Sequence, residues 1–347
     1  MLKGEIGSEF HNMPCGKGTG VAFPEKISDF ALTFSGRTAI ETVIRNIPQI
    51  KKVLLPSYCC DSMIEPFRRA GVAVRFFPVN CDGYLKIDLD ISNDIDCVLW
   101  CNYFGFEHLM PDFSAFIDRG GILIEDITHS FCSEQQFHEQ STYLVASLRK
   151  WEPINCGGYC ASVSRKLFKK PEINPPYEFI AHKRKTMELK AKYLTGIETI
   201  AKSQFLTDFT KSNSWLAENY TGLTIDKDSE QFLQKVNQDE EIEQRITNAN
   251  RLYKGIKTSE SLRFLFDEKD MDCPLFVPLI IRNGKRDAVR SELIKRGIYC
   301  PIHWPHPKAN CESNLYDMEL SLVCDQRYTE EDMDRIIAVI NEISYSD

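Results

Sequence analysis

Short apolar runs alternate with helix-like segments through the first half of the sequence, and this alternation constrains the fold more than any other feature. The apolar runs are bounded by turn residues, as is typical of strands buried on both faces, and they lie at residues 51–56, 72–79, 96–104 and 120–127. Segments with helical periodicity separate them, at residues 38–47, 62–71 and 112–121. The alternation predicts an α/β fold with a mostly parallel central sheet and helices on both faces.

The second half of the sequence has a different character. From about residue 177 to 220 it is charged and helical in period, which predicts long helices that leave the sheet. Helical and strand-like segments then alternate again, at residues 240–256, 273–283, 285–297 and 329–343. We therefore expect a large domain and a smaller C-terminal α/β domain, with bounds 1–239 and 240–347.

Composition excludes several classes of function. The net charge is -8, and Lys and Arg are scattered, so no surface for nucleic acid is expected. No stretch approaches the run of about 18 apolar residues that a membrane span needs, and the first residues lack a secretory apolar region. The 13 cysteines are odd in number and irregularly spaced, which favours a reduced, cytoplasmic compartment. We therefore expect a protein that acts on small molecules.

The turn at residues 34–39 is the first of three polar stretches that carry candidate chemistry. Its small residues open a helix, where free backbone N–H groups and the helix dipole favour an anion such as phosphate. Ordinary helix starts have a similar composition, so the turn indicates an anion site only together with other features.

The second stretch is an apolar strand that ends in Glu125 and Asp126, followed by Thr128 and His129. Ligands of a parallel sheet bind beyond the carboxyl ends of its strands. An acid there can cap the next turn, or it can hold a protonated ring nitrogen, because a partly desolvated cation gains much from a nearby carboxylate.

The third stretch contains Lys150, which lies 24 residues after Asp126 and ahead of a glycine pair at 157–158. Most lysines are solvated surface residues. In a partly buried site, however, the pKa of a lysine falls, and the neutral amine can attack a carbonyl and form an imine. Ser147 and Arg149 are close enough in sequence to reach a phosphate.

Taken in this order, the segments resemble the fold-type I enzymes that depend on pyridoxal 5'-phosphate (PLP), and within them the DegT/DnrJ/EryC1/StrS family of sugar aminotransferases. The resemblance runs from about residue 14 to the end of the chain. It is carried by SGRTAIE, LLPSYCCDSMIEPFRRAGVAVRFFPVN, CNYFGF, IEDITHSF, LRKWEPINCGG, GIYCPIHWP and LSLVCDQRYTEEDMDRIIAVI.

The resemblance implies three catalytic residues. Lys150 would hold PLP as a Schiff base and later move the proton between substrate and cofactor, Asp126 would pair with the ring nitrogen, and His129 would contact the ring hydroxyl. Further contacts to the cofactor are expected from Gly36, Arg37, Thr38, Tyr58, Cys60, Ser147 and Arg149. Substrate contacts are expected from His303 and Asn102.

The sequence departs from the family at several of these positions. Cys60 stands where the family has an aromatic residue over the pyridine ring, so we expect Tyr58 or His129 to stack there instead. Arg37 replaces a small hydroxyl residue, and Asn102 replaces a histidine. The Asn-x-Arg-Met-like segment through which a neighbouring subunit reaches the phosphate is absent.

The resemblance also implies function and assembly. We expect an aminotransferase that moves an amino group from an amino-acid donor to a carbonyl acceptor, a nucleotide-linked keto-sugar in polysaccharide or secondary-metabolite biosynthesis. The alternative is a catalytically silent relative that acts as a binding or regulatory subunit. A homodimer is expected, with residues 211–215 reaching the partner's site and four aromatic residues facing the partner, Tyr177, Phe179, Tyr193 and Phe205.

Competing motifs are weaker. A zinc site is weighed at four residues whose spacing loosely resembles ligand pairs, Cys300, His303, His306 and Cys311. The intervening prolines extend the backbone, and no second CxxC pair is present, so we expect no metal ligand. The GKGTG run at 16–20 lacks the residue order of a nucleotide P-loop, and no GxGxxG follows a strand, so kinases, ATPases and dinucleotide-dependent enzymes are excluded.

Overall fold

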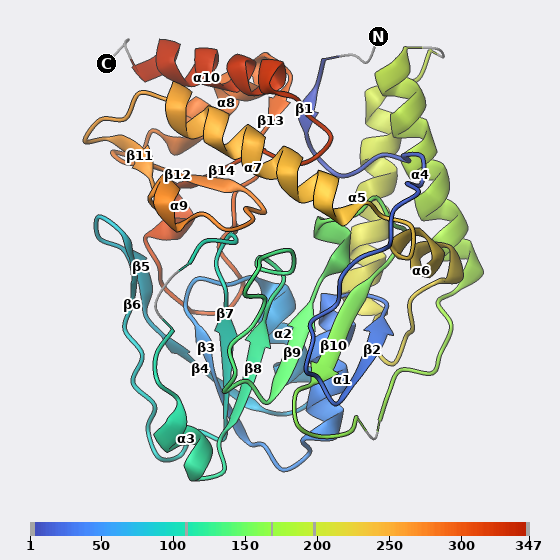
Figure 1. Ribbon diagram of the computed structural model, residues 1–347, viewed down its shortest axis with the longest axis vertical. Helices are drawn as coiled ribbons and strands as arrows, with labels where there is room; N and C mark the ends of the chain where they lie inside the picture. The colour runs from blue at the N-terminus through green and yellow to red at the C-terminus, as the bar shows by residue number, and fades with distance from the viewer. Residues whose placement is uncertain (1–3, 108–109, 168, 197–198, 345–347) are drawn as a thin grey trace.

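The computed structural model describes residues 4–107, 110–167, 169–196 and 199–344, and a seven-stranded sheet lies at its centre (Figure 1). The strand order is β2-β10-β9-β8-β7-β3-β4. Strands β9, β8, β7, β3 and β4 are parallel to one another, while β10 runs antiparallel to both of its neighbours. The strands are β2 Asp29–Thr33, β3 Lys52–Pro56, β4 Ala73–Phe77, β7 Cys97–Cys101, β8 Ile122–Asp126, β9 Tyr143–Ala146 and β10 Gly158–Ser162.

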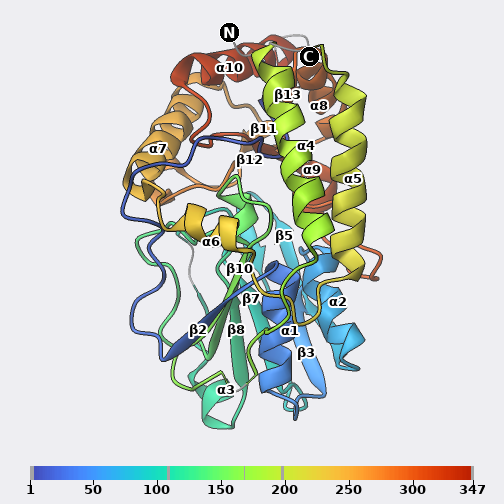
Figure 2. The same ribbon diagram turned by 90° about the vertical axis from the view of Figure 1, so that its right-hand side faces the viewer.

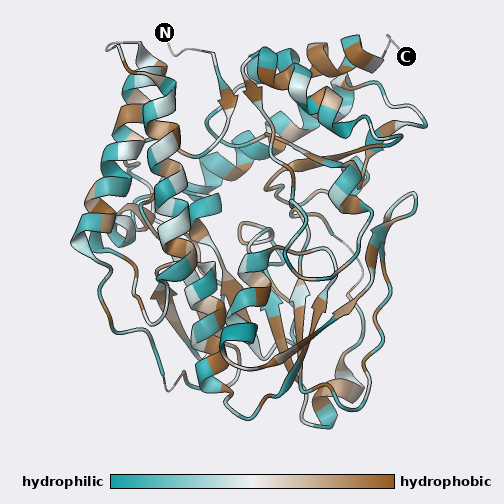
Figure 3. Ribbon diagram, turned by 180° about the vertical axis from the view of Figure 1, so that it is seen from behind, coloured by the Kyte–Doolittle hydropathy of each residue, from teal (hydrophilic) through white to brown (hydrophobic). Residues whose placement is uncertain are grey.

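The four apolar runs in the first half of the sequence form β3, β4, β7 and β8, which confirms the prediction of a mostly parallel sheet. Every residue of β7, β8 and β10 is buried, as expected for strands that are covered on both faces. Apolar colour is concentrated in these strands in Figure 3, whereas polar and apolar residues are mixed along the helices.

Helices cover both faces of this sheet. Helices α1 (Gly36–Asn46) and α2 (Asp61–Arg69) pack side by side on one face (Figure 2). Side chains from α6 (Lys227–Leu233) and from the N-terminal segment near Phe23 cover the other face around β9 and β10. The smaller elements of this domain are α3 Ser114–Asp118, β5 Val79–Cys81, β6 Leu85–Ile87 and the 3-10 turn Leu148–Lys150.

Two long helices stand beside the sheet, as the charged helical segment predicts. Helices α4 (Tyr177–Thr195) and α5 (Lys202–Glu218) pack against each other (Figure 2). The expectation that their aromatic residues face a partner is wrong for Phe179 and Phe205, which are 8% and 1% exposed and pack inside their own chain. Tyr177 is 79% exposed.

The C-terminal part of the chain forms the smaller α/β domain that the sequence predicts. Its antiparallel sheet has the order β11-β12-β14, with helices packed around it. The elements are α7 Gln238–Gly255, β11 Leu262–Phe264, the 3-10 turn Glu268–Asp270, β12 Val277–Ile281, α8 Arg286–Lys295, β13 Ile298–Tyr299, α9 Leu315–Met318, β14 Glu319–Leu322 and α10 Glu330–Ser344.

The N-terminal segment packs against this smaller domain, and the local sequence pattern does not predict this contact. Strand β1 (Ile6–Gly7) pairs in parallel with β13, and Ile6 is fully buried in the core of the C-terminal domain. The chain then crosses to the central sheet, so residues from both ends of the sequence enclose the space between the domains (Figure 1). None of the helices within the described ranges is long and apolar enough to span a bilayer.

Candidate active site

A small cavity of about 110 Å³ lies at the carboxyl ends of β8 and β9, where Asp126 ends one strand and Lys150 follows the other. All but two of the side chains predicted to bind the cofactor line this small cavity, namely Gly36, Arg37, Cys60, Asp126, His129, Ser147, Arg149 and Lys150. Segments from four separate parts of the sequence therefore meet at one place.

The first wall of the small cavity is the N-terminus of α1. The Ser35 side chain caps the helix by accepting a hydrogen bond from the Thr38 N–H at 3.3 Å. The glycine pair makes this turn possible, because a Cβ at Gly158 would lie 2.4 Å from the carbonyl group of Ser35. Close packing of the turn on β10 thus aims the free N–H groups of the helix into the cavity, where they favour an anion.

Two arginines near this helix start have buried nitrogen atoms without partners. The Nε atoms of Arg37 and Arg149 are both buried and make no hydrogen bond. Arg37 has an ion pair with Glu65 at 3.8 Å, whereas Arg149 has neither a hydrogen bond nor an ion pair among the described residues. Burial lowers the pKa of the Arg149 guanidinium, and the charge of Glu9 opposes this. A buried guanidinium nitrogen without a hydrogen bond is unfavourable, so an anionic group that accepts from these Nε atoms suits this end of the cavity.

Asp126 lies on the floor of the small cavity and is 8% exposed. Burial raises the pKa of its carboxyl group, while hydrogen bonds from Thr128, including one from the backbone N–H at 2.9 Å, and the charge of Lys150 act in the opposite direction. A cationic ring nitrogen next to this carboxylate would restore its ionised form, because the interaction takes place away from water.

His129 is held in one tautomer by its surroundings. Its Nδ1 accepts a hydrogen bond from the Phe104 N–H at 3.0 Å, so the proton of the neutral ring is on Nε2. Burial lowers the pKa of His129 well below its usual value, and the charge of Lys150 adds to the effect. The Nε2 atom lies 3.4 Å from Lys150 Nζ and is a hydrogen-bond donor at the side of the cavity.

Lys150 ends the short 3-10 turn that follows β9. The turn is tied to the end of β8 by two hydrogen bonds to Thr128, from the Ser147 N–H at 3.0 Å and from the Trp151 indole at 2.6 Å. These bonds fix the position of the lysine relative to Asp126, since Thr128 is only two residues beyond it. The Nζ atom of Lys150 lies 5.6 Å from the centre of the Trp304 ring.

Besides His303, which is described below, three predicted residues lie outside the small cavity. The Thr38 hydroxyl donates to the Tyr220 carbonyl at 2.9 Å and so points away. Tyr58 is fully buried behind the wall, where its ring packs against Tyr103, Trp304 and Tyr316. Asn102 donates to Glu125 at 2.7 Å and to Ser130 at 3.0 Å and lines a different cavity.

Trp304 is a site residue that sequence reasoning missed. Its ring stacks on His129 with the centroids 5.6 Å apart, and it lines the small cavity opposite Cys60 and the other residues of the large domain. The only signal in the sequence is its position beside His303 in the run GIYCPIHWP. We expected Tyr58 or His129 to take the place of the missing aromatic residue, and Trp304 was not among the predicted site residues.

A larger cavity of about 460 Å³ adjoins the small one and shares Ser147, Arg149 and Lys150 with it. It lies between the two domains, and His303 is on its wall together with residues of the N-terminal segment. The predicted substrate residue His303 therefore lies in the same space as Lys150.

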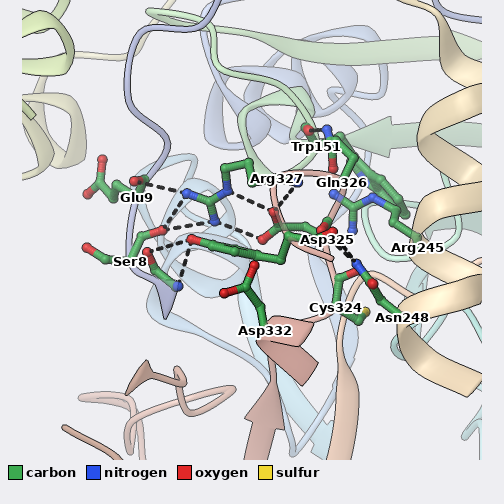
Figure 4. A network of polar contacts seen from close by, with 12 residues as sticks. Ser8, Glu9, Trp151, Arg245, Asn248, Cys324, Asp325, Gln326, Arg327 and Asp332 are labelled. Carbon is green, nitrogen blue, oxygen red and sulfur yellow. Dashed lines mark hydrogen bonds and ion pairs between the residues drawn. The ribbon is translucent and has the colours of Figure 1, made fainter. Parts of the chain in front are cut away.

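An ion-pair network closes one end of this larger cavity (Figure 4). Arg327 makes two hydrogen bonds of 2.8 Å to the Asp325 carboxylate and donates to the backbone carbonyls of Ser8 and Glu9. Arg327 also stacks on the Phe10 ring at 4.2 Å. The network binds the N-terminal segment over the mouth of the cavity.

The seven-stranded sheet and the smaller C-terminal domain form a fold that this chain shares with solved sugar aminotransferases. No protein-family model matches the sequence, and no curated protein matches it. Solved structures do match. A putative sugar aminotransferase from Streptococcus pneumoniae in its PLP form is similar over 99% of this chain and 99% of its own, with a TM-score of 0.67 and 12% identity.

Two further structures show the same likeness. A DegT/DnrJ/EryC1/StrS aminotransferase from Brucella abortus has a TM-score of 0.62 and 15% identity, and the match covers 91% of this chain and 86% of that one. The NtdA protein of Bacillus subtilis with bound PMP has a TM-score of 0.59 and 12% identity over 90% and 73% of the two chains. At these identities the comparisons establish the fold.

Proposed function

We propose that this protein is a PLP-dependent aminotransferase that moves an amino group from an amino-acid donor to a carbonyl acceptor. The observation that carries the proposal is the convergence of Lys150, Asp126 and His129 in one cavity whose far end is built for an anion. A nucleotide-linked keto-sugar, used in polysaccharide or secondary-metabolite biosynthesis, is the acceptor we propose.

The residues of the small cavity fit PLP. The N-terminus of α1 with Gly36, Arg37, Ser147 and Arg149 would hold the phosphate group. When bound, PLP supplies an electron sink that stabilises negative charge next to the amino group being transferred.

The remaining residues of the cavity have distinct roles in this proposal. Asp126 would keep the ring nitrogen protonated, and His129 would donate its Nε2 proton to the ring hydroxyl oxygen. Lys150 would bind the cofactor covalently and, once released, carry a proton to and from the substrate carbon.

The substrate class is supported by what the similar structures contain. DesI was crystallised in the presence of its TDP-sugar product, and it is similar over 98% of this chain with a TM-score of 0.60 and 12% identity. DesV from S. venezuelae was crystallised with a ketimine intermediate, with a TM-score of 0.62 and 14% identity. The larger cavity beside Lys150 offers space for such an acceptor.

The proposal is tested by adding PLP to the purified protein and then an amino donor without an acceptor. We expect a yellow absorption band when PLP binds and its loss when L-glutamate delivers its amino group. A protein that binds PLP but leaves the band unchanged with every common amino acid would be the silent relative, and a protein that takes up no PLP would exclude the proposed function.

Arg149 provides a prediction about the phosphate group. Arg149→Gln should weaken PLP affinity about 10- to 100-fold, because a charge-assisted contact in a buried site contributes roughly 1.5–3 kcal/mol. Fluorescence titration of the PLP-free protein measures the affinity, with Arg251→Gln as the control, since Arg251 is on the surface in an ion pair with Asp334. Equal affinities of the Arg149 variant and the wild type would remove Arg149 from the phosphate site.

We also propose that the protein is a cytoplasmic homodimer. All 13 cysteines are free thiols, as suits a reducing compartment. Ile173 and Tyr177, four residues apart in the sequence, are large hydrophobic side chains that are 59% and 79% exposed, which favours burial by a second copy. Asn213, which was expected to reach the partner's site, instead donates to Glu9 at 2.6 Å and lines the larger cavity of its own chain.

The dimer is tested by sedimentation at micromolar concentration. The wild type should sediment at twice the mass of one chain, and Tyr177→Glu should raise the dissociation constant at least about 10-fold, because it buries an unpaired charge. Tyr84→Glu is the matched control, with a tyrosine that is 65% exposed on the hairpin β5–β6. A wild-type monomer with full PLP occupancy would contradict the proposal.

A further inference from the structure

A chain of three polar side chains runs from the interior of the C-terminal domain to the larger cavity. Glu319 begins β14, and Ser321 lies two residues farther along the same strand. The Ser321 hydroxyl is 2.5 Å from Glu319 Oε1 and 2.8 Å from His303 Nδ1. The backbone N–H of His303 donates to Glu319 Oε2 at 2.7 Å, so the two ends of the chain are held in a fixed relation.

The chain is shielded from solvent except at its histidine end. Glu319 and Ser321 are both 0% exposed. His303 lines the larger cavity together with Lys150, and its Nε2 makes no hydrogen bond among the described residues and is not enclosed by protein. Among the side-chain polar atoms of Glu319, Ser321 and His303, His303 Nε2 is thus the one that a substrate in the larger cavity can contact.

The direction of the hydrogen bonds depends on the proton of Glu319. When the carboxylate is ionised, Ser321 donates to it and accepts from His303 Nδ1–H, which leaves a lone pair on Nε2. When the carboxyl group is protonated, it donates to Ser321, and Ser321 donates to Nδ1, which puts the proton of His303 on Nε2. One proton on a buried acid therefore decides whether the cavity faces a donor or an acceptor.

The surroundings of His303 favour the neutral ring, so a proton that enters on one nitrogen should be balanced by one that leaves from the other. Burial lowers the pKa of His303 well below its usual value, and the charge of Lys150 adds to this, so an imidazolium is disfavoured. Burial raises the pKa of Glu319 to about 8, against the hydrogen bonds from Ser321 and His303 and the charge of Arg286. The other ionisable groups that face these three residues are Tyr58 and Cys300 next to Glu319 and His129 next to His303.

We propose that Glu319, Ser321 and His303 form a proton relay that serves the carbonyl acceptor in the larger cavity. The inference rests on the proposed function. In the forward step the C–O bond of the acceptor breaks as an amine condenses with it, and the electron pair leaves with the oxygen. That oxygen takes the proton from His303 Nε2, His303 Nδ1 takes the Ser321 proton, and Ser321 takes the Glu319 proton. The oxygen already carries a hydrogen that came from the amine, so it leaves as water. The new C=N group then bears the positive charge, and Glu319 bears the negative charge.

The relay is tested first in the PLP-free protein, where no chemistry is needed. Histidine labelled with ¹⁵N reports the tautomer of each ring by NMR, and the His303 signals are assigned by their loss in His303→Asn. Between pH 6 and 10 we expect His303 to change from the Nε2–H to the Nδ1–H tautomer with a midpoint near 8. A single tautomer throughout this range in the wild type would overturn the relay.

Substitutions along the chain separate a relay from a purely structural role. Glu319→Gln should hold His303 as the Nε2–H tautomer at every pH, because the amide always donates to Ser321. Ser321→Ala should uncouple the tautomer from pH, and Ser321→Thr, which keeps the hydroxyl, should restore the coupling. A wild-type titration in Glu319→Gln or in Ser321→Ala would overturn the proposal.

Kinetics then connect the relay to the reaction. The aminated holoenzyme is mixed with 2-oxoglutarate as the carbonyl probe, and the donor step with L-glutamate is measured separately. Loss of a general acid should slow the carbonyl step of Glu319→Gln by roughly 10²-fold or more and remove its dependence on pH near 8, while PLP affinity stays within about 2-fold. A variant that binds PLP, reacts with L-glutamate and uses 2-oxoglutarate at the wild-type rate would overturn the relay and leave the proposed function intact.

Discussion

Lys150→Ala is expected to abolish covalent binding of PLP and to lower amino-transfer turnover by roughly 10⁴-fold or more. Lys150 is the lysine whose Nζ lies within 3.4 Å of His129 in the small cavity, next to the floor formed by Asp126. Among the described residues that line the small cavity, Lys150 is the one lysine, so its amine is the group that we expect to react with the carbonyl carbon of PLP. The measurement is the yellow band after PLP addition.

A covalent readout and a matched control make this test sharper. Borohydride reduction followed by peptide mapping should place the pyridoxyl group on Lys150 of the wild type. Lys183→Ala is the control, because Lys183 is another buried lysine on the wall of the larger cavity, paired with Glu9 at 2.7 Å, and this variant should keep the reducible bond. A pyridoxyl group found on a different lysine would refute the assignment.

Asp126→Ala should lower the rate by about 10²- to 10⁴-fold, much more than it lowers PLP affinity, because the phosphate contacts remain. The carboxylate acts by keeping the ring nitrogen charged in a site with little water, where one ion pair has a large effect on the electron sink. Asp126→Asn keeps the size of the side chain and should have nearly the same effect on the rate. Single-turnover mixing with L-glutamate measures it, and near-normal turnover in either variant would contradict the role.

The pH dependence of cofactor binding gives a second measurement on Asp126. Burial raises the pKa of its carboxyl group in the PLP-free protein, and a protonated ring nitrogen would lower it again. The acid therefore loses its proton when PLP binds, so affinity should decrease as the pH falls through the pKa of the PLP-free protein. In Asp126→Asn this part of the pH dependence should disappear, and its persistence would assign the titration to another group.

Local sequence pattern was a sufficient guide to the elements that build the central sheet. Strands buried on both faces need nearly uninterrupted apolar residues, so the runs that become β3, β7 and β8 can be recognised without knowledge of their neighbours. The edge strand β4 is only partly buried, and it is recognised from its apolar run between turn residues. The sequence also indicated that Asp126 and Lys150 lie near each other, because the carboxyl ends of parallel strands meet at one edge of the sheet, and both residues line the small cavity. Their roles toward a cofactor came from the family resemblance and stay predictions.

Side-chain direction was not predictable at the same positions. Thr38 and Asn102 are in the expected segments, but their polar groups are satisfied by Tyr220 and Glu125, respectively, and do not face the small cavity. A hydroxyl or amide binds whichever partner the packed fold presents, and that partner is far away in the sequence. The same reason hid Trp304, whose stacking on His129 joins two domains.

The sequence by itself determined the mostly parallel sheet and the smaller C-terminal α/β part, because both depend on apolar periodicity. The link between the turn, the acid, the lysine and PLP came from the resemblance to a known family, and it stays a prediction. Only the tertiary structure decided what surrounds the lysine. It brought Ile6 beside Ile298, left the Nε atom of Arg149 buried without a hydrogen bond among the described residues, and aligned Glu319, Ser321 and His303. Such contacts arise when separate elements pack and exclude water, and exclusion of water gives each buried charge and hydrogen bond its strength.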